Sequence, residues 1–409
     1  MDIGITDRLR PLLDAVKVFI DERVLPVDEE FLAEVDRGDR WTLTDRQKEI
    51  LDDIKSAARA QNLWNFWLTD SERGYGLSTV EYAYLAEEMG RSQLAAEAFS
   101  CSAPDTGNME VLERYGTAEQ KQQWLEPLLA GEIRSAYAMT EPDVASSDAT
   151  NISTSAILEN GEWLINGEKT YISGAGDPRC KIMICMVKSN PDNGRHQQHS
   201  QILIPMDTPG VEIVRPMHVF ADDDAPHGHM HIRLTDVRVP EANMLLGPGR
   251  GFEIAQGRLG PGRVHHCMRL IGAAERALKL MCERAVSRTA FGRPLAKLGG
   301  NYDKIANARM NIDMARLLTL QTAHIIDTRG VQESQVWISK IKATVPNVAL
   351  AVIDDAIQIH GAAGISKDFP LAAMYTAART LRFADGPDEV HRMVVARNEL
   401  RPYMKNLQS

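Results

Sequence analysis

The sequence contains few cysteines, and their spacing forms no pairs. Its 409 residues include five cysteines with no C-x-x-C pair among them: Cys101, Cys180, Cys185, Cys267 and Cys282. An odd number without such spacing argues against the disulfide framework of a secreted protein and favours a reducing compartment. The N-terminal stretch MDIGITDRLRPLLDAVKVF also lacks an apolar targeting core and an Arg/Ser-rich, acid-poor composition. We therefore expect a cytoplasmic protein without a targeting signal.

An excess of positive charge and long apolar runs are also absent. The formal net charge is −10, whereas nucleic-acid binding requires a basic surface that neutralises phosphates. The apolar runs stay short of the roughly 20 residues needed to span a bilayer. The sequence therefore predicts neither nucleic acid as a partner nor a membrane span.

The remaining composition is that of a large globular protein that begins with helices. Hydrophobic residues make up 44% and charged residues 25%, and 409 residues exceed one small core, so two or three domains are expected. The pattern is helical from Asp7 to Gly131. Thr44, and Ser78 or Thr79, stand where N-caps of two of these helices are expected.

Strand signals replace the helical pattern at Glu132. Asn160-Gly161 and Asn166-Gly167 both predict hairpin turns, because Asn-Gly tolerates the positive φ angles of a type I′ turn. The expected strands are residues 154–158, 162–165, 170–172, 182–187, 201–205, 211–214, 229–234 and 237–239. These features predict an all-β middle domain.

The helical pattern returns at Gly251. Three long apolar stripes begin at Met268, Ile305 and Ile338, and they predict a helix bundle whose flat faces suit self-association into a homo-oligomer. We therefore expect a multidomain α+β protein. Its domains would be a helical domain over residues 1–133, a β domain over residues 134–243 and a helix bundle over residues 244–409.

The segment Ala378–Val390, with the sequence ARTLRFADGPDEV, is the first candidate for chemistry. Gly386 and Pro387 break the helical pattern after Asp385, so that this carboxylate can point into a cavity. The alternative is a plain helix end, with Asp388 as the N-cap of the next helix. Taken alone, the segment favours that alternative.

Two other patterns have less specific interpretations. His227, His229 and His231 alternate, and on a strand they would share one face at a spacing that can bind zinc. Exposed histidines on a strand edge are the preferred interpretation, since a metal site also needs supporting partners, and we predict no metal. The glycine-containing stretches 247–251 and 167–170 lack the context of nucleotide-binding loops and are interpreted as turns.

Five ordered motifs resemble the acyl-CoA dehydrogenase family over nearly the whole chain. They are YAMTEPDVASSDA from Tyr137, EKTYIS from Glu168, RTAFGRPL from Arg288, QIHGA from Gln358 and ADGP from Ala384. The last motif lies where the family carries a catalytic Glu-Gly-Thr. The sequences of these motifs are most similar to a branch related to the dehydrogenase domains that are fused to kinase-like domains in animals.

The resemblance implies an N-terminal helical domain, a middle β-barrel and a C-terminal four-helix bundle, assembled as a dimer or a dimer of dimers. FAD would lie between domains and across a subunit interface. The residues at the matching cofactor positions are Tyr137, Met139, Thr140, Tyr171, Ile172, Ser173, Arg288, Phe291, Gln358, Gly361, Ala362, Pro387 and Glu389. Ser147, Arg263 and Gly386 would contact the acyl-CoA substrate.

The reaction that the resemblance implies is α,β-dehydrogenation of a fatty acyl-CoA to the trans-2-enoyl-CoA. A carboxylate removes the Cα proton, the Cβ hydride passes to flavin, and an electron-transfer flavoprotein accepts the electrons. The base position holds Asp385 where the family has Glu, so the substrate or backbone must approach by about one C–C bond. Some relatives carry the base immediately before the arginine that matches Arg263; that position is Gly262 here, which favours Asp385.

Other functions fit the same motifs. An enzyme resembling nitroalkane oxidase would also use Asp as its base and would pass electrons to oxygen. An acyl-CoA oxidase and a flavin-free adaptor that retained the fold are further alternatives.

Overall fold

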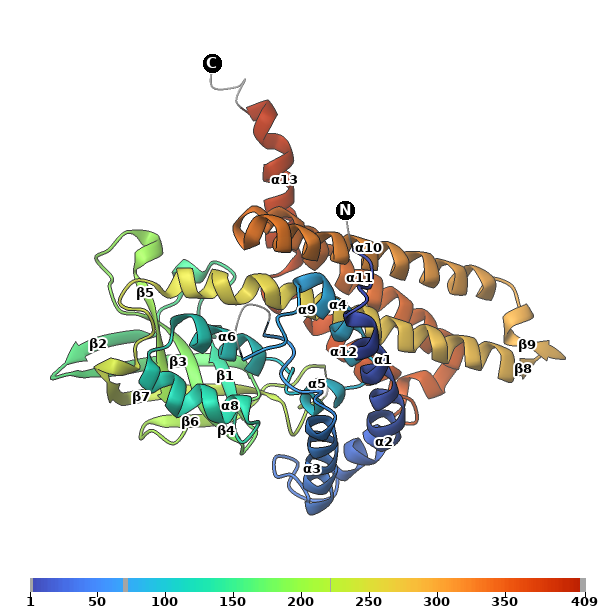
Figure 1. Ribbon diagram of the computed structural model, residues 1–409, viewed down its shortest axis with the longest axis horizontal. Coiled ribbons are helices and arrows are strands. Elements are labelled where there is room, and N and C mark those ends of the chain that lie inside the picture. The colour runs from blue at the N-terminus through green and yellow to red at the C-terminus, as the bar shows by residue number, and fades with distance from the viewer. Residues whose placement is uncertain (1–2, 69–72, 221, 405–409) are drawn as a thin grey trace. The chain divides into compact units, whose positions relative to one another are not determined.

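The computed structural model describes residues 3–68, 73–220 and 222–404, in which helices precede and follow a block of strands (Figure 1). The N-terminal helices are α1 (Leu9–Phe19), α2 (Leu25–Glu34), α3 (Asp45–Ala60), α4 (Thr79–Met89), α5 (Ala95–Ala98), α6 (Asp105–Tyr115), α7 (Ala118–Gln120) and α8 (Glu126–Leu129). The strands that follow are β1 (Arg134–Ala138), β2 (Ser155–Glu159), β3 (Glu162–Ser173), β4 (Cys180–Lys188), β5 (His199–Pro205), β6 (Val211–Pro216) and β7 (His229–Pro240). The C-terminal elements are α9 (Gly251–Ser287), β8 (Thr289–Ala290), β9 (Arg293–Pro294), α10 (Asn301–Glu333), α11 (Gln335–His360), α12 (Leu371–Thr380) and α13 (Asp388–Met404).

These elements form two compact units. The bundle unit contains residues 1–24, 77–96 and 260–409, and the sheet unit contains residues 25–76 and 97–259. The N-terminal helices are thus divided between the two units. The domain boundaries expected at residues 133/134 and 243/244 remain predictions.

The predicted helix starts at Thr44 and Ser78 are confirmed. The Thr44 hydroxyl accepts a hydrogen bond from Gln47 N, and the Ser78 hydroxyl accepts one from Glu81 N, both at 3.1 Å. In each case the side chain of that third helical residue bonds back to the cap backbone, which completes a capping box. Each cap satisfies amide groups that the first turn of the helix leaves without partners.

The middle strands form one curled sheet in the order β1-β4-β2-β3-β7-β6, with β5 paired to β4. Its core contains apolar residues of alternate positions, among them Ile165, Met183, Ile204 and Ile232, which are all fully buried. The expectation of a β domain is confirmed. In the part of the chain that the structure describes, the pairing does not return from β6 to β1, so the sheet is curled and not a closed ring.

One of the two predicted hairpins is present and the other is wrong. Glu159 pairs with Glu162 around the Asn160-Gly161 turn. Asn166-Gly167, in contrast, lies inside the continuous strand β3, where the pairing register with β7 shifts between Ile165 and Gly167. A Cβ atom at Gly167 would lie 2.9 Å from Thr154 Cα, so the glycine is needed for a close backbone approach at a bulge.

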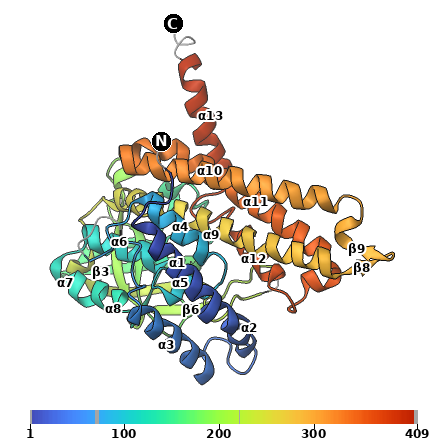
Figure 2. The ribbon, with the colours of Figure 1, turned by 45° about the vertical axis from the view of Figure 1, so that its right-hand side comes forward.

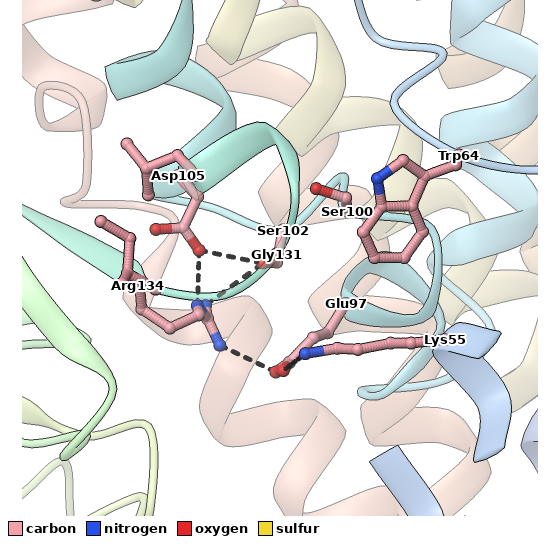
Figure 3. Close-up of a pocket in the computed structure, with 10 residues that line it drawn as sticks. Lys55, Trp64, Glu97, Ser100, Ser102, Asp105, Gly131 and Arg134 are labelled. Atoms are coloured by element: carbon pink, nitrogen blue, oxygen red, sulfur yellow. Dashed lines mark hydrogen bonds and ion pairs between the residues drawn. The ribbon is translucent and has the colours of Figure 1, made fainter. Parts of the chain in front are cut away.

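A buried ion network fixes the start of β1 in the sheet unit. Arg134 lies between Asp105 (Nε to Oδ2, 2.5 Å) and Glu97 (Nη1 to Oε2, 2.8 Å), and Lys55 contacts the other side of Glu97 (Figure 3). Burial opposes the charge of Glu97, but the cations around it hold its pKa well below the usual value. The adjacent cavity has a volume of about 20 Å³, which is room for one water molecule. We interpret this cavity as part of a structural ion network and not as a binding site, because its charged groups are already paired with one another.

The bundle unit is built on the long helices α9, α10 and α11, with α12 and α13 packed on α11 (Figure 2). Among the described residues, one helical stretch, 335–365, has the length and mean hydropathy (1.4) of a membrane-crossing helix. Helix α11 packs against α10, α12 and α13, and 44% of the apolar window is buried. The short β8–β9 hairpin joins α9 to α10 at the end of these helices (Figure 2).

Candidate functional site

Two of the sequence motifs lie side by side in the sheet unit. Thr170 N donates a 2.8 Å hydrogen bond to Thr140 O, which joins the segment after β1 to strand β3. Tyr171 follows at a second register shift of β3, with a φ of +56° and 53% of its surface exposed. A bulky residue with positive φ is strained and is held there by its surroundings. The bulge therefore presents an aromatic ring on an open face beside Thr140.

A buried ion pair between Lys169 and Glu141 supports the surface formed by Thr140 and Tyr171. The Lys169 ammonium donates to Glu141 Oε1 (2.9 Å), Met139 O (3.2 Å) and Met186 O (2.7 Å), and its side chain is fully buried. Glu141 also accepts hydrogen bonds from the backbone and hydroxyl groups of Ser153 and Thr154. Burial opposes its charge, but Lys169 and these hydrogen bonds lower the pKa of Glu141 to about 2. The pair fixes the backbone at Met139, next to the exposed Thr140.

Tyr137 and Arg258 form the adjoining part of the same unit. The Tyr137 hydroxyl accepts a hydrogen bond from Gln201 Nε2 at 3.0 Å, and the Arg258 guanidinium lies 3.9 Å from the centroid of the Tyr137 ring. Ile172 is buried, whereas Ser147 is exposed. Tyr137, Met139, Thr140, Tyr171 and Ser173 therefore come from two neighbouring segments of the sheet unit.

Two of the three alternating histidines, His229 and His231, lie on strand β7, whereas His227 precedes it; all three are half-buried, and the two on the strand have polar partners. The Ser173 hydroxyl lies 2.8 Å from His229 Nδ1, and His231 Nε2 lies 2.6 Å from Glu168 Oε2. Because β7 lies between β3 and β6, the expectation of exposed histidines on a strand edge is wrong. Within residues 3–68, 73–220 and 222–404, no group of three or more His, Cys, Asp and Glu side chains is arranged to hold a metal ion.

Asp385 occupies a tight turn between α12 and α13 in the bundle unit. Its φ is +57° and that of Gly386 is +104°, so two successive residues adopt the left-handed region. Arg263 Nε donates to the Asp385 carbonyl at 3.0 Å, and His391 Nε2 lies 3.2 Å from the same oxygen. Buried Lys342 donates to the carbonyls of Leu381 and Gly386. The turn is thus fixed by side chains of α9, α11 and α13.

His391 supports this turn as a neutral ring. Burial lowers its pKa to about 4, and the cations of Arg263 and Lys342 act in the same direction. A neutral imidazole that faces a carbonyl oxygen must carry its proton on Nε2, so Nδ1 is assigned as the acceptor from the Ser339 hydroxyl at 3.3 Å. The His391 ring therefore donates to Asp385 across the physiological pH range.

The expectation that Asp388 caps the next helix is wrong. Asp388 is the first residue of α13, and its buried carboxylate accepts from Arg382 Nε (2.8 Å) and Asn347 Nδ2 (3.1 Å). Burial opposes its charge, but these two donors lower the pKa of the carboxyl. Asp388 therefore anchors the turn to α11, and its side chain does not cap α13.

The remaining predicted cofactor residues are on the surface of the bundle unit. Gln358, Gly361 and Ala362 are exposed at the end of α11, while Pro387 directly precedes α13 and Glu389 is the second residue of α13. Arg288 and Phe291 belong to the β8–β9 connection, where 94% of Phe291 is exposed. In the bundle unit the structure thus joins Arg263, Asp385 and Gly386 into one cluster.

Three residues of that cluster were not predicted from the sequence. Lys342 interrupts the third apolar stripe between Ile341 and Val345, which is a signal that its ammonium needs buried partners. His266 follows Arg263 by three residues, so both lie on one face of α9. For His391 the sequence offered no comparable signal.

Replacement of Gly386 by alanine is expected to destabilise the turn. An added Cβ would lie 3.0 Å from His391 Nε2, and the φ of +104° is strained for any residue with a side chain. We expect a loss of at least about 1–2 kcal/mol in the free energy of unfolding, measured by denaturant titration. Gly262→Ala is the matched control, because a Cβ there meets nothing within 4 Å inside helix α9. The control should gain about 0.5–1 kcal/mol; a similar gain at Gly386 would contradict the strain argument.

Comparison with known proteins assigns the family. Three family models match in order: the acyl-CoA dehydrogenase N-terminal domain over residues 6–132, the middle domain over residues 136–236 and the C-terminal domain over residues 249–400. An N-terminal helical domain, a curled sheet and a C-terminal helix bundle, in this order along the chain, define this class of oxidoreductase. The chain belongs to the acyl-CoA dehydrogenase family.

Individual relatives agree with this assignment. Acyl-CoA dehydrogenase family member 10 of Mus musculus is 53% identical over 403 residues, which are 97% of this chain and 37% of that protein. Probable acyl-CoA dehydrogenase FadE2 of Mycobacterium tuberculosis is 53% identical over 352 residues, which are 86% of each chain. A solved structure from Mycobacterium abscessus is 52% identical, with a TM-score of 0.94 over 98% of this chain and 100% of that chain.

The chain spans between 37% and 52% of the length of the animal and plant relatives that it matches. Solved structures with the same fold and 22–23% identity include complexes with FAD and with FADH2.

Proposed function

We propose that this chain is an FAD-dependent dehydrogenase of fatty acyl-CoA thioesters, with Asp385 as the base that removes the Cα proton. The observation that carries the proposal is the turn at Asp385. Its backbone is fixed by Arg263 and His391, while 18% of the carboxylate side chain stays exposed at the motif position where the family carries its base. A base must be both positioned and accessible, and this residue is both.

FAD suits the open face of the sheet unit. Tyr171 offers an exposed aromatic ring, and exposed Thr140 lies on a backbone that Lys169 and Glu141 hold in place. An aromatic face beside fixed polar groups suits a flat polar ring system, which needs stacking at its face and hydrogen bonds at its edge. When bound, FAD would supply the site that accepts the Cβ hydride. Tyr137, Met139, Thr140, Tyr171 and Ser173 would hold it from this unit.

The chain's own residues then account for the proton. The Asp385 carboxylate takes the Cα proton and becomes a carboxylic acid, while a Cα=Cβ double bond forms and the Cβ hydride leaves. Gly386 has no side chain, so that the thioester can approach the backbone next to the base. Because an aspartate is one methylene shorter than a glutamate, the substrate must lie closer to the Asp385 backbone than to that of a glutamate base.

A homo-oligomer and an electron-transfer flavoprotein are the proposed partners. A contact with a second copy of the chain would cover Phe291, which is 94% exposed next to exposed Arg288, and would gain the free energy of burying its ring. There Arg288 would reach the FAD of the neighbouring subunit, since a guanidinium binds a pyrophosphate with two parallel hydrogen bonds. All five cysteines are free thiols, which supports a reducing compartment such as the cytoplasm.

Anaerobic reduction of the flavin by a panel of saturated acyl-CoA esters tests the proposed function. We expect the flavin absorbance to fall on mixing with acyl-CoA, with the fastest reduction at one range of chain lengths, and an artificial acceptor to restore it. Oxygen consumption with nitroethane, recorded in parallel, tests the alternative enzyme class. Nitroethane turnover without reduction by any acyl-CoA would overturn the proposal, and a purified chain that never retains FAD would favour the adaptor.

A further inference from the structure

His266 on α9 lies against the carboxylate of Asp385. Its Nε2 atom is 3.5 Å from Asp385 Oδ2, and both side chains are mostly buried, with 21% and 18% of their surface exposed. This distance is at the outer limit of a hydrogen bond between the heavy atoms. Arg263 and His391 hold the Asp385 backbone, whereas His266 faces its reactive group.

The protonation of His266 is set from its other side. Arg269 Nη2 lies 3.2 Å from His266 Nδ1, and a guanidinium nitrogen can only donate. We therefore assign Nδ1 of His266 as the acceptor and place the proton of the neutral ring on Nε2. That N–H is the one that faces the Asp385 carboxylate. The three side chains form an ordered chain from guanidinium to imidazole to carboxylate.

The spacing along α9 explains why one helix can contact both the backbone carbonyl and the side-chain carboxylate of Asp385. Arg263, His266 and Arg269 recur every three residues, so that they follow one face of the helix over two turns. Arg263 reaches the Asp385 carbonyl, and His266, one turn later, reaches the carboxylate. The helix therefore fixes the distance between the two contacts.

We propose that His266 is a positioning residue for the Asp385 base: its Nε2–H, oriented by Arg269, directs the carboxylate and stabilises its ionised form. The inference rests on the proposed function, since it assigns a role next to the proposed base. A neutral donor to a carboxylate favours its charged state without adding a further cation beside Arg263. Because an aspartate has a short stem and few rotamers, one directed hydrogen bond can set its orientation.

Other charged and titratable groups also face this turn, and each must be held constant in a test. They are Arg263, Cys267 and Arg269 from α9, Lys342 from α11, and Asp388 and His391 from α13. Burial raises the pKa of Cys267 to about 12, so the thiol stays neutral. The pKa of His391 is about 4, and its titration could overlap that of a carboxyl. The variants below therefore change His266 alone.

Three substitutions of His266 distinguish the effect of its hydrogen-bond donor from the effect of its side-chain volume. In His266→Gln the carboxamide nitrogen reaches about as far as imidazole Nε2, so the donor is kept. In His266→Leu the volume is roughly kept and the donor is lost. His266→Asn keeps a polar side chain that is too short to reach the carboxylate. It replaces the leucine variant as the variant without the donor if His266→Leu does not fold. Retention of FAD and the thermal midpoint are compared first, to establish that each holoprotein is intact.

The first measurement is independent of turnover. A pH titration followed by infrared difference spectroscopy records the carboxylic-acid C=O band that is absent in Asp385→Asn, and its midpoint is the pKa of Asp385. We expect the midpoint in the leucine and asparagine variants to rise by about one pH unit above wild type, a tenfold change in the protonation equilibrium. The glutamine variant should stay within a few tenths of a unit. Equal midpoints in wild type and the leucine variant, or a glutamine variant that matches leucine, would overturn the proposal.

The second measurement uses the fastest saturated acyl-CoA of the panel. Anaerobic flavin reduction depends on the ionised base, so its rate should rise with pH through the pKa of Asp385. In His266→Leu this rise should move to higher pH by the same amount as the infrared midpoint, and His266→Gln should restore it. Unshifted profiles would contradict the positioning role. If the wild-type flavin is reduced by no acyl-CoA, the proposed function fails; if Asp385→Asn reduces it normally, the base assignment fails. In both cases the infrared result still decides whether His266 acts on Asp385.

Discussion

Asp385→Asn is expected to retain FAD and to lose reduction of the flavin by acyl-CoA. The amide has nearly the same shape, so the turn that Arg263 and His391 fix through the Asp385 carbonyl should persist. It cannot accept the Cα proton, and a positioned general base contributes about 10²–10⁴-fold to the rate. Stopped-flow absorbance under anaerobic conditions should show a fall in the reduction rate within that range.

Asp385→Glu is the matched variant for this experiment. It restores a carboxylate with the longer stem that the family motif carries, so a measurable part of the rate should return. Normal reduction in Asp385→Asn would refute the base assignment and direct attention to Asp388 or Glu389. Because Asp388 is buried against Arg382 and Asn347, the exposed Glu389 would then be the better candidate.

Lys169→Met is expected to cause the largest loss of stability. The change leaves the Glu141 carboxylate, 5% exposed, without its cation, and it removes donors from the carbonyls of Met139 and Met186. Breaking a buried ion pair by removing one partner costs about 3–5 kcal/mol. Denaturant unfolding at neutral pH should show that loss, and FAD retention should fall as well because the backbone at Met139 and Thr140 is released.

Lys48→Met is the control for this substitution. Lys48 pairs with Asp45 at 3.0 Å on the surface, where 54% and 96% of the two side chains are exposed. Exposed pairs of this kind contribute less than about 1 kcal/mol. A loss in Lys169→Met no larger than that in Lys48→Met would contradict the role of the buried pair.

The acid dependence of stability gives a second check on Glu141. Its pKa of about 2 in the folded chain is below the usual value of 4.5. A lowered pKa adds stability that is fully present above the unfolded value and is lost as the pH falls toward 2. We expect Glu141→Gln to remove this part of the decline in the free energy of unfolding below pH 4.5. An unchanged acid profile would mean that other carboxyl groups dominate.

The sequence by itself determined the order of elements and the family. The change of period at Glu132 falls between the end of α8 at Leu129 and the start of β1 at Arg134, because helix and strand periods are local properties of the chain. The caps at Thr44 and Ser78 were predictable for the same reason. The family motifs also pointed to Asp385 as the proposed base, since a fixed order of short segments can be recognised without coordinates.

Tertiary structure decided the details on which the site depends. Asn166-Gly167 has the sequence of a turn but becomes a bulge, because strand β7 and Thr154 pack against it from distant parts of the chain. Asp388 has the sequence of a cap but binds Arg382 and Asn347, and the latter comes from α11. Local patterns cannot reveal which partner a polar side chain meets.

His266 shows the same limit at the proposed base. The sequence places it one turn after Arg263, yet its proximity to Asp385 requires α9 to pack against a turn more than a hundred residues later in the chain. The Lys169–Glu141 pair likewise joins two motifs that the sequence presents separately. Propensity and periodicity act over a few residues, whereas the orientation of a carboxylate depends on contacts made only after the chain has folded.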